Sequence, residues 1–305
     1  MPDAAAPQRS GDPLPAHLER IRHLAWEGFA FLLPPHWEIT AYSLDAAKGQ
    51  FQFFERESFR AQLVWRKVPK APDLPRILNE IHRRQLEKDD PAAAKAFSSL
   101  EFSQIGRFLI GHEQPGRPCQ ASLFRPDIGL LLQWVFPAHD PDAFTAAWTP
   151  LLDSYEANDG PLRRWELFGI GLRLPEAMVF QELTPEPANV ALTFETPKHL
   201  KLVARRMGMP EILLAGSDLA RCHATILERA GSRVLESEPR TLMGYPAVRT
   251  VFDRRGEKGM EKLVGRWWTG EAWIWHQRDE ARLYTLEQVG PKRPSRLEVA
   301  DVMRW

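Results

Sequence analysis

Short runs of this chain alternate apolar and polar residues with a period of two, which is typical of a strand with one buried face. Between positions 170 and 174, the apolar residues Ile170, Leu172 and Leu174 share one face. The apolar run from Phe29 to Leu33 stops at a proline pair, and proline cannot donate to a sheet ladder. Polar turns separate the further predicted strands, at positions 49–54, 60–68, 190–193 and 199–206.

Two segments repeat their apolar residues with the period of an α-helix instead. In the first segment the apolar positions 74, 77, 78 and 81 form one face, and Asp73 stands where an N-cap belongs. In the second, Ser217 or Asp218 can cap the start, and Gly231 fits the C′ position, where φ is positive. The second stripe consists of Leu219, Cys222, His223, Ile226, Leu227 and Ala230.

Each half of the chain is expected to end in a further helix. One begins at Asp140, and Pro150 should kink it or start a second helix from Thr149. The other is opened by the capping box Ser295-Arg-Leu-Glu298 and runs to Trp305.

The two halves repeat short motifs in the same order. The matching pairs are Trp26-Glu27 with Trp165-Glu166, Leu63-Val-Trp-Arg-Lys67 with Leu202-Val-Ala-Arg-Arg206, Asp73-Leu-Pro-Arg76 with Asp218-Leu-Ala-Arg221, and Arg107-Phe-Leu-Ile-Gly111 with Arg240-Thr-Leu-Met-Gly244. Because the spacing drifts while the order is kept, we predict an ancient duplication with insertions and deletions in loops.

The order of elements is strands, helix, strands, helix, and it occurs twice. An apolar helix stripe needs a sheet face to cover, and the short connections favour antiparallel pairing. We therefore expect an α+β protein with two similar domains, each an antiparallel sheet covered by helices. The expected domains are residues 16–157 and 158–305, with the boundary in the turn-forming run Asn158-Asp-Gly-Pro161. Residues 1–15 are expected to be a disordered leader.

The segment Phe29-Ala-Phe-Leu-Leu-Pro-Pro-His-Trp37 resembles the opening of PsbP-like domains, in which an apolar strand is followed by proline, a small turn and tryptophan. The later order of strands, helix, strands and terminal helix is similar to that superfamily in each half, although Pro175-Glu-Ala-Met178 lacks the tryptophan. The superfamily includes the photosystem extrinsic protein PsbP and a Ran-binding nuclear transport factor. The resemblance implies a binding or assembly role.

Composition narrows the classes of function. The 305 residues suit two domains, and 40 basic residues balance 40 acidic ones. This balance argues against a protein that coats nucleic acid through bulk charge. Two cysteines are too few for a disulfide framework, and no apolar run is long enough to cross a bilayer. The N-terminal residues lack the pattern of a secretory signal, so the cytoplasm is the expected location.

No recognised catalytic motif occurs, so the sequence predicts no catalytic residue, metal or cofactor. Cys222 and His223 could form a nucleophile or a metal site, but both lie on the apolar stripe of their helix and are expected in the core. His112, Glu113 and Cys119 lie close in sequence without a recognised metal-ligand spacing.

Trp267, Trp268, Trp273 and Trp275 fall within nine residues. We interpret Thr269-Gly-Glu271 as the turn of a hairpin, with Trp273 and Trp275 on one face and Trp267 and Trp268 on opposite faces. Each tryptophan buries on the order of 200 Å², so something should cover the face that helices leave open. The cover can be the other half of the chain, a protein partner, or a stacked sugar or base.

We therefore expect a non-catalytic binding or scaffold protein, acting through a Trp-rich sheet face on a protein partner or a second copy of itself. The binding residues are then the four tryptophans with Arg266 and His276. The alternative is an enzyme or small-ligand carrier with His112, Glu113 and His276 in a cleft between the halves. A third option, nucleic-acid binding, would need Arg163-Arg164, Arg205-Arg206 and Lys292-Arg293 to form one stripe.

Overall fold

The computed structural model describes residues 22–303 except 46, 115–116, 138–147, 187, 257–266 and 292–301. The predicted leader at 1–15 lies outside these residues, as do most of the helix predicted from Ser295 and the start of the helix predicted from Asp140. All strands pair antiparallel, and they form three sheets.

The first seven-stranded sheet has the strand order β3-β4-β5-β9-β8-β7-β6. Its strands are β3 (Glu38–Ser43), β4 (Lys48–Glu55), β5 (Ser58–Lys67), β6 (Glu101–Ile105), β7 (Phe108–Gln114), β8 (Arg117–Arg125) and β9 (Leu130–Val135). Helices α1 (Leu74–Asp89) and α2 (Pro91–Ala96) connect β5 to β6, and α4 (Thr149–Asp153) follows β9.

The second seven-stranded sheet has the order β13-β14-β15-β19-β18-β17-β16, which is the same connectivity. Its strands are β13 (Val179–Glu186), β14 (Asn189–Glu195), β15 (Lys201–Met207), β16 (Ser232–Leu242), β17 (Tyr245–Arg255), β18 (Trp267–Gln277) and β19 (Arg282–Gly290). Helices α5 (Pro210–Leu213) and α6 (Leu219–Arg229) connect β15 to β16, and a 3₁₀ turn (Arg278–Glu280) precedes β19.

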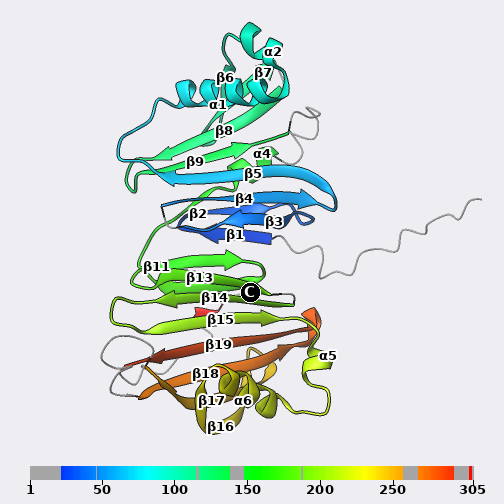
Figure 1. The fold of residues 1–305 in the computed structure, drawn as a ribbon, viewed down its shortest axis with the longest axis vertical. Coiled ribbons are helices and arrows are strands. Elements are labelled where there is room, and N and C mark those ends of the chain that lie inside the picture. Colours follow the sequence, from blue (N-terminus) through cyan, green and yellow to red (C-terminus); the bar gives the residue numbers. More distant parts are fainter. Residues whose placement is uncertain are drawn as a thin grey trace, which may run out of the picture.

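A middle sheet of five strands has the order β10-β2-β1-β11-β12 and lies between the two larger sheets (Figure 1). Its strands are β1 (Arg22–Trp26), β2 (Gly28–Leu33), β10 (Glu156–Asn158), β11 (Leu162–Leu167) and β12 (Ile170–Pro175). The hairpins β1–β2 and β11–β12 come from opposite halves of the chain, and they pair where Ala25 faces Glu166.

The predicted α+β fold, with two separate sheets each covered by helices, is wrong. The described chain is largely β and has three sheets rather than two. The prediction failed because the period of the apolar residues identifies a strand but does not determine which other strand it pairs with. The hairpins β1–β2 and β11–β12 pair with each other across the halves, and the helices cover only part of the outer faces of the large sheets.

One continuous apolar core joins the three sheets. Trp26 of the middle sheet packs edge-on against Trp165 with ring centres 5.1 Å apart. It also lies 6.1 Å from Trp65 of the first large sheet and 4.7 Å from Phe180 of the second. Edge-to-face aromatic contacts at these distances stabilise a core beyond the area they bury. The middle sheet is therefore a shared core element and leaves no open cleft between the halves along these contacts.

Helices α1 and α6 form where the apolar stripes predict them. The carboxylates of Asp73 and Asp218 cap the two helices by accepting from the backbone N–H groups of Arg76 and Arg221. Gly231 follows the C-cap of α6 with φ +75°, as expected for a C′ glycine. The helix α4 begins at Thr149, the start predicted from Pro150.

A polar side chain from each large sheet contacts a turn of the middle sheet. Arg125 of β8 donates from Nη1 to the carbonyl oxygen of Gly28, in the turn of β1–β2. On the other side, the Tyr284 hydroxyl of β19 lies 3.4 Å from the carbonyl oxygen of Gly169, in the turn of β11–β12, and donates its one proton to Glu280 at 2.7 Å. Both turn glycines have positive φ, which glycine adopts without a steric cost.

Asn158 joins the two hairpins of the middle sheet. Its side-chain Nδ2 donates to the carbonyl oxygens of Trp26 at 2.8 Å and Arg164 at 2.5 Å, and its Oδ1 accepts from the Arg164 backbone N–H at 2.8 Å. Its side chain therefore replaces ladder hydrogen bonds where β1 and β11 diverge. Asn158 is buried, so these backbone groups have no water to bond instead.

We predict that Asn158→Ala lowers the free energy of unfolding by about 3 kcal/mol, because two carbonyls and one N–H lose their partners in a buried place. Urea unfolding followed by tryptophan fluorescence measures this change. Asn189→Ala is the control, because its Nδ2 has one acceptor among the described residues, the exposed Glu186. Equal losses for the two variants would show that Asn158 does not hold the hairpins together.

Candidate functional site

The tryptophan-rich segment is one continuous strand, β18, and the predicted hairpin turn at Thr269-Gly-Glu271 is wrong. Gly270 suggested a turn, but it serves a close approach within the sheet. A Cβ on Gly270 would lie 2.3 Å from Cζ of the Phe252 ring on the neighbouring strand. The glycine is therefore needed to admit a buried aromatic ring next to it.

Three of the four clustered tryptophans are buried in the hydrophobic core. Trp273 and Trp275 point from β18 toward the middle sheet, and Trp275 stacks on Tyr284 with ring centres 5.6 Å apart. Trp268 points to the opposite face and packs with Leu227 of α6. These three side chains are buried, so packing inside the chain accounts for most of the cluster.

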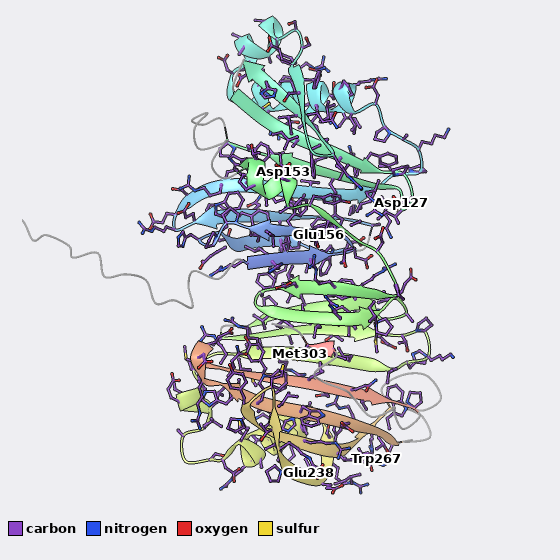
Figure 2. All side chains as sticks on the ribbon, turned by 180° about the vertical axis from the view of Figure 1, so that it is seen from behind. Asp127, Asp153, Glu156, Glu238, Trp267 and Met303 are labelled. Carbon is purple, nitrogen blue, oxygen red and sulfur yellow. The ribbon has the colours of Figure 1, made fainter. Side chains whose placement is uncertain are left out.

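Trp267 differs from the other described tryptophans because it is 42% exposed, whereas each of the others is buried. The Arg233 guanidinium lies 5.0 Å from its ring centre and the Arg255 guanidinium 5.7 Å from it. Guanidinium groups at this range are attracted to the ring face and hold it in one orientation. We call Trp267, Arg233 and Arg255 the Trp267 platform; Figure 2 shows Trp267 near the end of the second large sheet.

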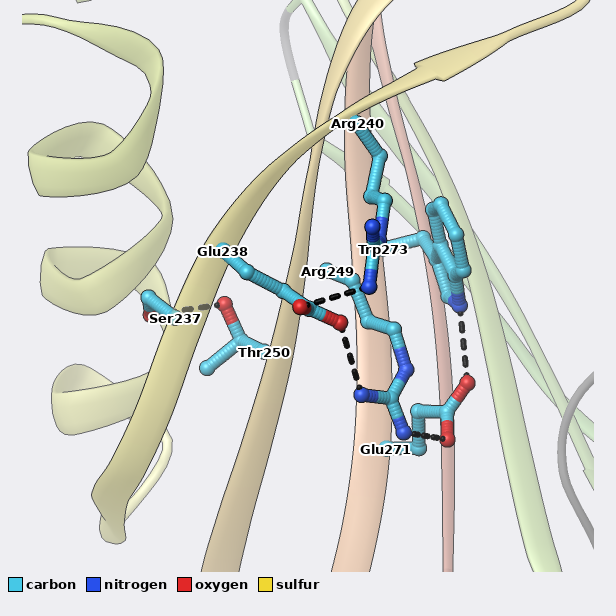
Figure 3. Close-up of polar contacts among 7 residues, drawn as sticks. All are labelled: Ser237, Glu238, Arg240, Arg249, Thr250, Glu271 and Trp273. Carbon is cyan, nitrogen blue, oxygen red and sulfur yellow. Dashed lines mark hydrogen bonds and ion pairs between the residues drawn. The ribbon is translucent and has the colours of Figure 1, made fainter.

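A ladder of alternating charges continues from the platform along the same face of β16, β17 and β18 (Figure 3). Arg249 donates to Glu238 at 3.0 Å and to Glu271 at 2.6 Å, and Glu271 also accepts from the Trp273 indole N–H. Arg240 bonds Glu238 at 2.6 Å. Bonds from Arg240 and Arg249 lower the pKa of Glu238, so the carboxylate stays charged at neutral pH. This part of the face is polar and its charges are matched.

The register explains why sequence reasoning missed Arg233 and Arg255 as partners of Trp267. Arg255 pairs with Trp267 across β17 and β18, and Arg233 pairs with Asp253 one strand further out. These residues are 12 to 34 positions apart in the chain, and only the strand pairing brings them together. Arg266, which was predicted to bind beside Trp267, lies outside the described residues.

The residues proposed for a cleft enzyme are not brought together. His112 and Glu113 lie on β7 of the first large sheet, where His112 contacts the Ser103 hydroxyl at 2.6 Å. His276 lies on β18 of the second large sheet, on the other side of the middle sheet. Within the described ranges, no three His, Cys, Asp or Glu side chains gather closely enough to hold a metal ion.

The two basic pairs that the structure describes, out of the three considered for nucleic acid, do not form one stripe. Adjacent residues on a strand point to opposite faces, so Arg163 and Arg164 on β11 diverge. Both are matched by carboxylates, Arg163 by Glu176 at 2.6 Å and Arg164 by Glu156 at 2.7 Å. The pair at 205–206 is on β15 of the second large sheet, and the pair at 292–293 lies outside the described residues.

Cys222 and His223 are buried in α6, which confirms the prediction that they belong to the core. His223 Nδ1 lies 2.9 Å from the Thr250 hydroxyl. Burial is the largest influence on its ionisation and lowers the pKa of His223 to about 4, while nearby Glu287 raises it and Arg205 lowers it. His223 is therefore neutral at pH 7.

No protein-family model matches the sequence, and no curated protein matches it. Among solved structures, the immunity protein TplEi of T6SS from Pseudomonas aeruginosa matches 90% of this chain and 88% of its own, at 12% identity and a TM-score of 0.32. The Ran-binding protein Mog1p of Saccharomyces cerevisiae matches 43% of this chain and 77% of its own, at 12% identity and a TM-score of 0.31.

A third structure, a Pseudomonas aeruginosa protein of unknown function, matches 43% of this chain and 85% of its own, at 18% identity and a TM-score of 0.25. TM-scores of this size carry no argument about fold or function, so the PsbP-like resemblance stays a prediction. Separately, none of the helices in the described parts of the chain has the length and apolarity needed to cross a membrane.

The buried His223 generates a prediction about acid stability. Its pKa is about 4 in the folded protein and about 6.5 when unfolded, so the unfolded chain takes up the proton first as the pH falls. The stability it contributes is complete above about pH 6.5 and is lost as the pH falls toward 4, by on the order of 3 kcal/mol. Chemical unfolding at several pH values measures this loss.

His223→Gln is the comparison variant, because glutamine can still bond Thr250 but does not titrate. We expect the wild type to lose more stability than this variant between pH 6.5 and 4, with the difference growing across that range. Parallel stability curves for the two proteins would contradict the assignment of a neutral buried His223.

Proposed function

We propose that this chain is a binding protein that recognises a partner protein through the Trp267 platform. The observation that carries the proposal is the exposure of Trp267 in a chain whose other described tryptophans are buried. Covering the exposed part of such a side chain, about 100 Å², would contribute roughly 2–3 kcal/mol to binding. Tryptophan and arginine are also the residues most often found at the energetic centre of protein interfaces.

The platform favours a partner with an acidic surface. Arg255 and Arg233 both present guanidinium groups beside the indole ring, and Arg233 is paired with Asp253 at 3.0 Å. A carboxylate on the partner can bond the outer edge of such a guanidinium while an apolar group packs on the indole. The ladder beyond the platform has matched charges and would serve as the polar rim of the interface.

Two further parts of the proposal concern organisation. We propose that residues 16–157 and 158–305 are repeats of one ancestral unit, a view supported by the shared strand order of the two large sheets. We also propose a cytoplasmic location. A second copy of this chain remains an alternative partner, because the edge strand β16 borders the platform and carries the exposed Leu235.

Trp267→Ser should abolish recovery of the partner without unfolding the protein, because the side chain is outside the core. Purification of the tagged full chain from its native host, with mass spectrometry, identifies what is recovered. Binding of the purified partner is then measured by calorimetry, and we expect a loss of at least about tenfold in affinity. Sedimentation of the chain alone tests the second-copy alternative.

The matched control is Ile212→Ser on α5, which also removes an exposed apolar side chain, 64% exposed, but far from the platform in sequence. Substituting Trp273 or Trp275 would be uninformative because both belong to the core. Unchanged partner affinity and unchanged sedimentation for Trp267→Ser would refute the platform as an interface.

A further inference from the structure

A polar groove of about 300 Å³ lies on the opposite face of the second large sheet, beside the end of α6. Arg254 and Arg255 are neighbours on β17, so their side chains point to opposite faces of the sheet. Arg255 belongs to the Trp267 platform, and Arg254 therefore lies on the other face, which α6 partly covers. The groove's lining includes Glu182, Glu186, Lys201, Arg205 and Arg254.

A buried ionic cluster adjoins this groove. Glu287 of β19 is almost completely buried and uses one carboxylate oxygen for each of two arginines, Arg254 at 2.5 Å and Arg205 at 3.4 Å. Arg254 is 6% exposed, and its Nε donates to the Ser232 hydroxyl. Its Nη2 is also buried and has no hydrogen-bond partner among the described residues. Arg205 is the accessible member, with 20% of its side chain exposed.

Among the described residues, the cluster itself pairs two guanidinium groups with one carboxylate, while Lys201, Glu182 and Glu186 also line the groove. Burial opposes ionisation of Glu287, but the two guanidiniums outweigh it and lower its pKa, so the carboxylate is charged. His223, which faces the cluster from α6, is neutral at pH 7. The two guanidinium groups and the Glu287 carboxylate are therefore all charged in a largely buried site. An unpaired charge in such a site costs free energy, which a second bound anion would lower. On the far side of the groove, β13 supplies the carboxylates of Glu182 and Glu186.

The first large sheet shows that this connectivity does not require the cluster. Glu287 stands opposite Val203 in the pairing of β15 with β19, and Gln133 stands opposite Val64 in the corresponding pairing of β5 with β9. A neutral amide thus occupies the position of the buried carboxylate. Arg66, the counterpart of Arg205, is opposite Leu131 and exposed.

From this geometry we propose that the groove binds a small zwitterion, with its carboxylate on Arg205 and Arg254 and its ammonium group near Glu182 and Glu186. The ligand carboxylate would contact Arg205 first, because Arg205 is the more exposed of the two arginines. The Nη2 of Arg254, which has no partner among the described residues, lies deeper in the cluster. This site is independent of the Trp267 platform, because the two lie on opposite faces of the sheet and share no residue.

The test is calorimetric titration of the full chain with 6-aminohexanoate, which carries a carboxylate and an ammonium group on an apolar stem. We expect binding to the wild type and a loss of about tenfold or more for Arg205→Gln. Arg205→Lys keeps the charge but not the planar fork, so it should also weaken binding. Arg66→Gln is the matched control and should bind like the wild type.

Absence of binding to the wild type at about 10 mM ligand, or equal binding by Arg205→Gln, would overturn the proposal. Two further probes test its parts. Inorganic phosphate should bind more weakly than 6-aminohexanoate, and equal or tighter phosphate binding would overturn the assignment to a carboxylate. Hexanoate should also bind more weakly, and equal affinity would overturn the role given to Glu182 and Glu186.

Discussion

The rest of this structure depends on burying the one apolar face of the small middle sheet. The middle sheet takes one hairpin from each half of the chain, and neither hairpin could stay in water with residues such as Trp26 and Trp165 exposed. Each large sheet covers the part of this face that one hairpin supplies: Phe29 packs on Trp65 of the first large sheet, and Trp165 packs on Phe194 of the second. The two halves therefore share one core. Most of the aromatic residues that could form a binding surface are buried in that core.

Burying the middle sheet imposes a second constraint, because its backbone polar groups are also taken out of water. Side chains from neighbouring elements form hydrogen bonds with some of these backbone groups. Asn158 completes the ladder where the hairpins part, and Arg125 donates to the carbonyl oxygen of the β1–β2 turn. These contacts cross between elements distant in sequence.

The two faces of the second large sheet are then left with different roles. One face packs on the middle sheet and continues outward as the charge ladder and the Trp267 platform. The other face is covered in part by α6, and where the helix ends the buried cluster around Glu287 adjoins a polar groove. Both proposed sites thus lie at the margins of this sheet, and the residues at its centre pack in the core.

Local pattern alone determined the helices α1 and α6 with their caps, the core position of Cys222 and His223, and the start of α4, because each depends on residues close in sequence. Tertiary structure decided the third sheet, the continuous strand through Gly270 and the pairing of Trp267 with Arg233 and Arg255. The physical reason is that a strand's period specifies which face is buried, while its hydrogen-bonding edges accept any partner of suitable register.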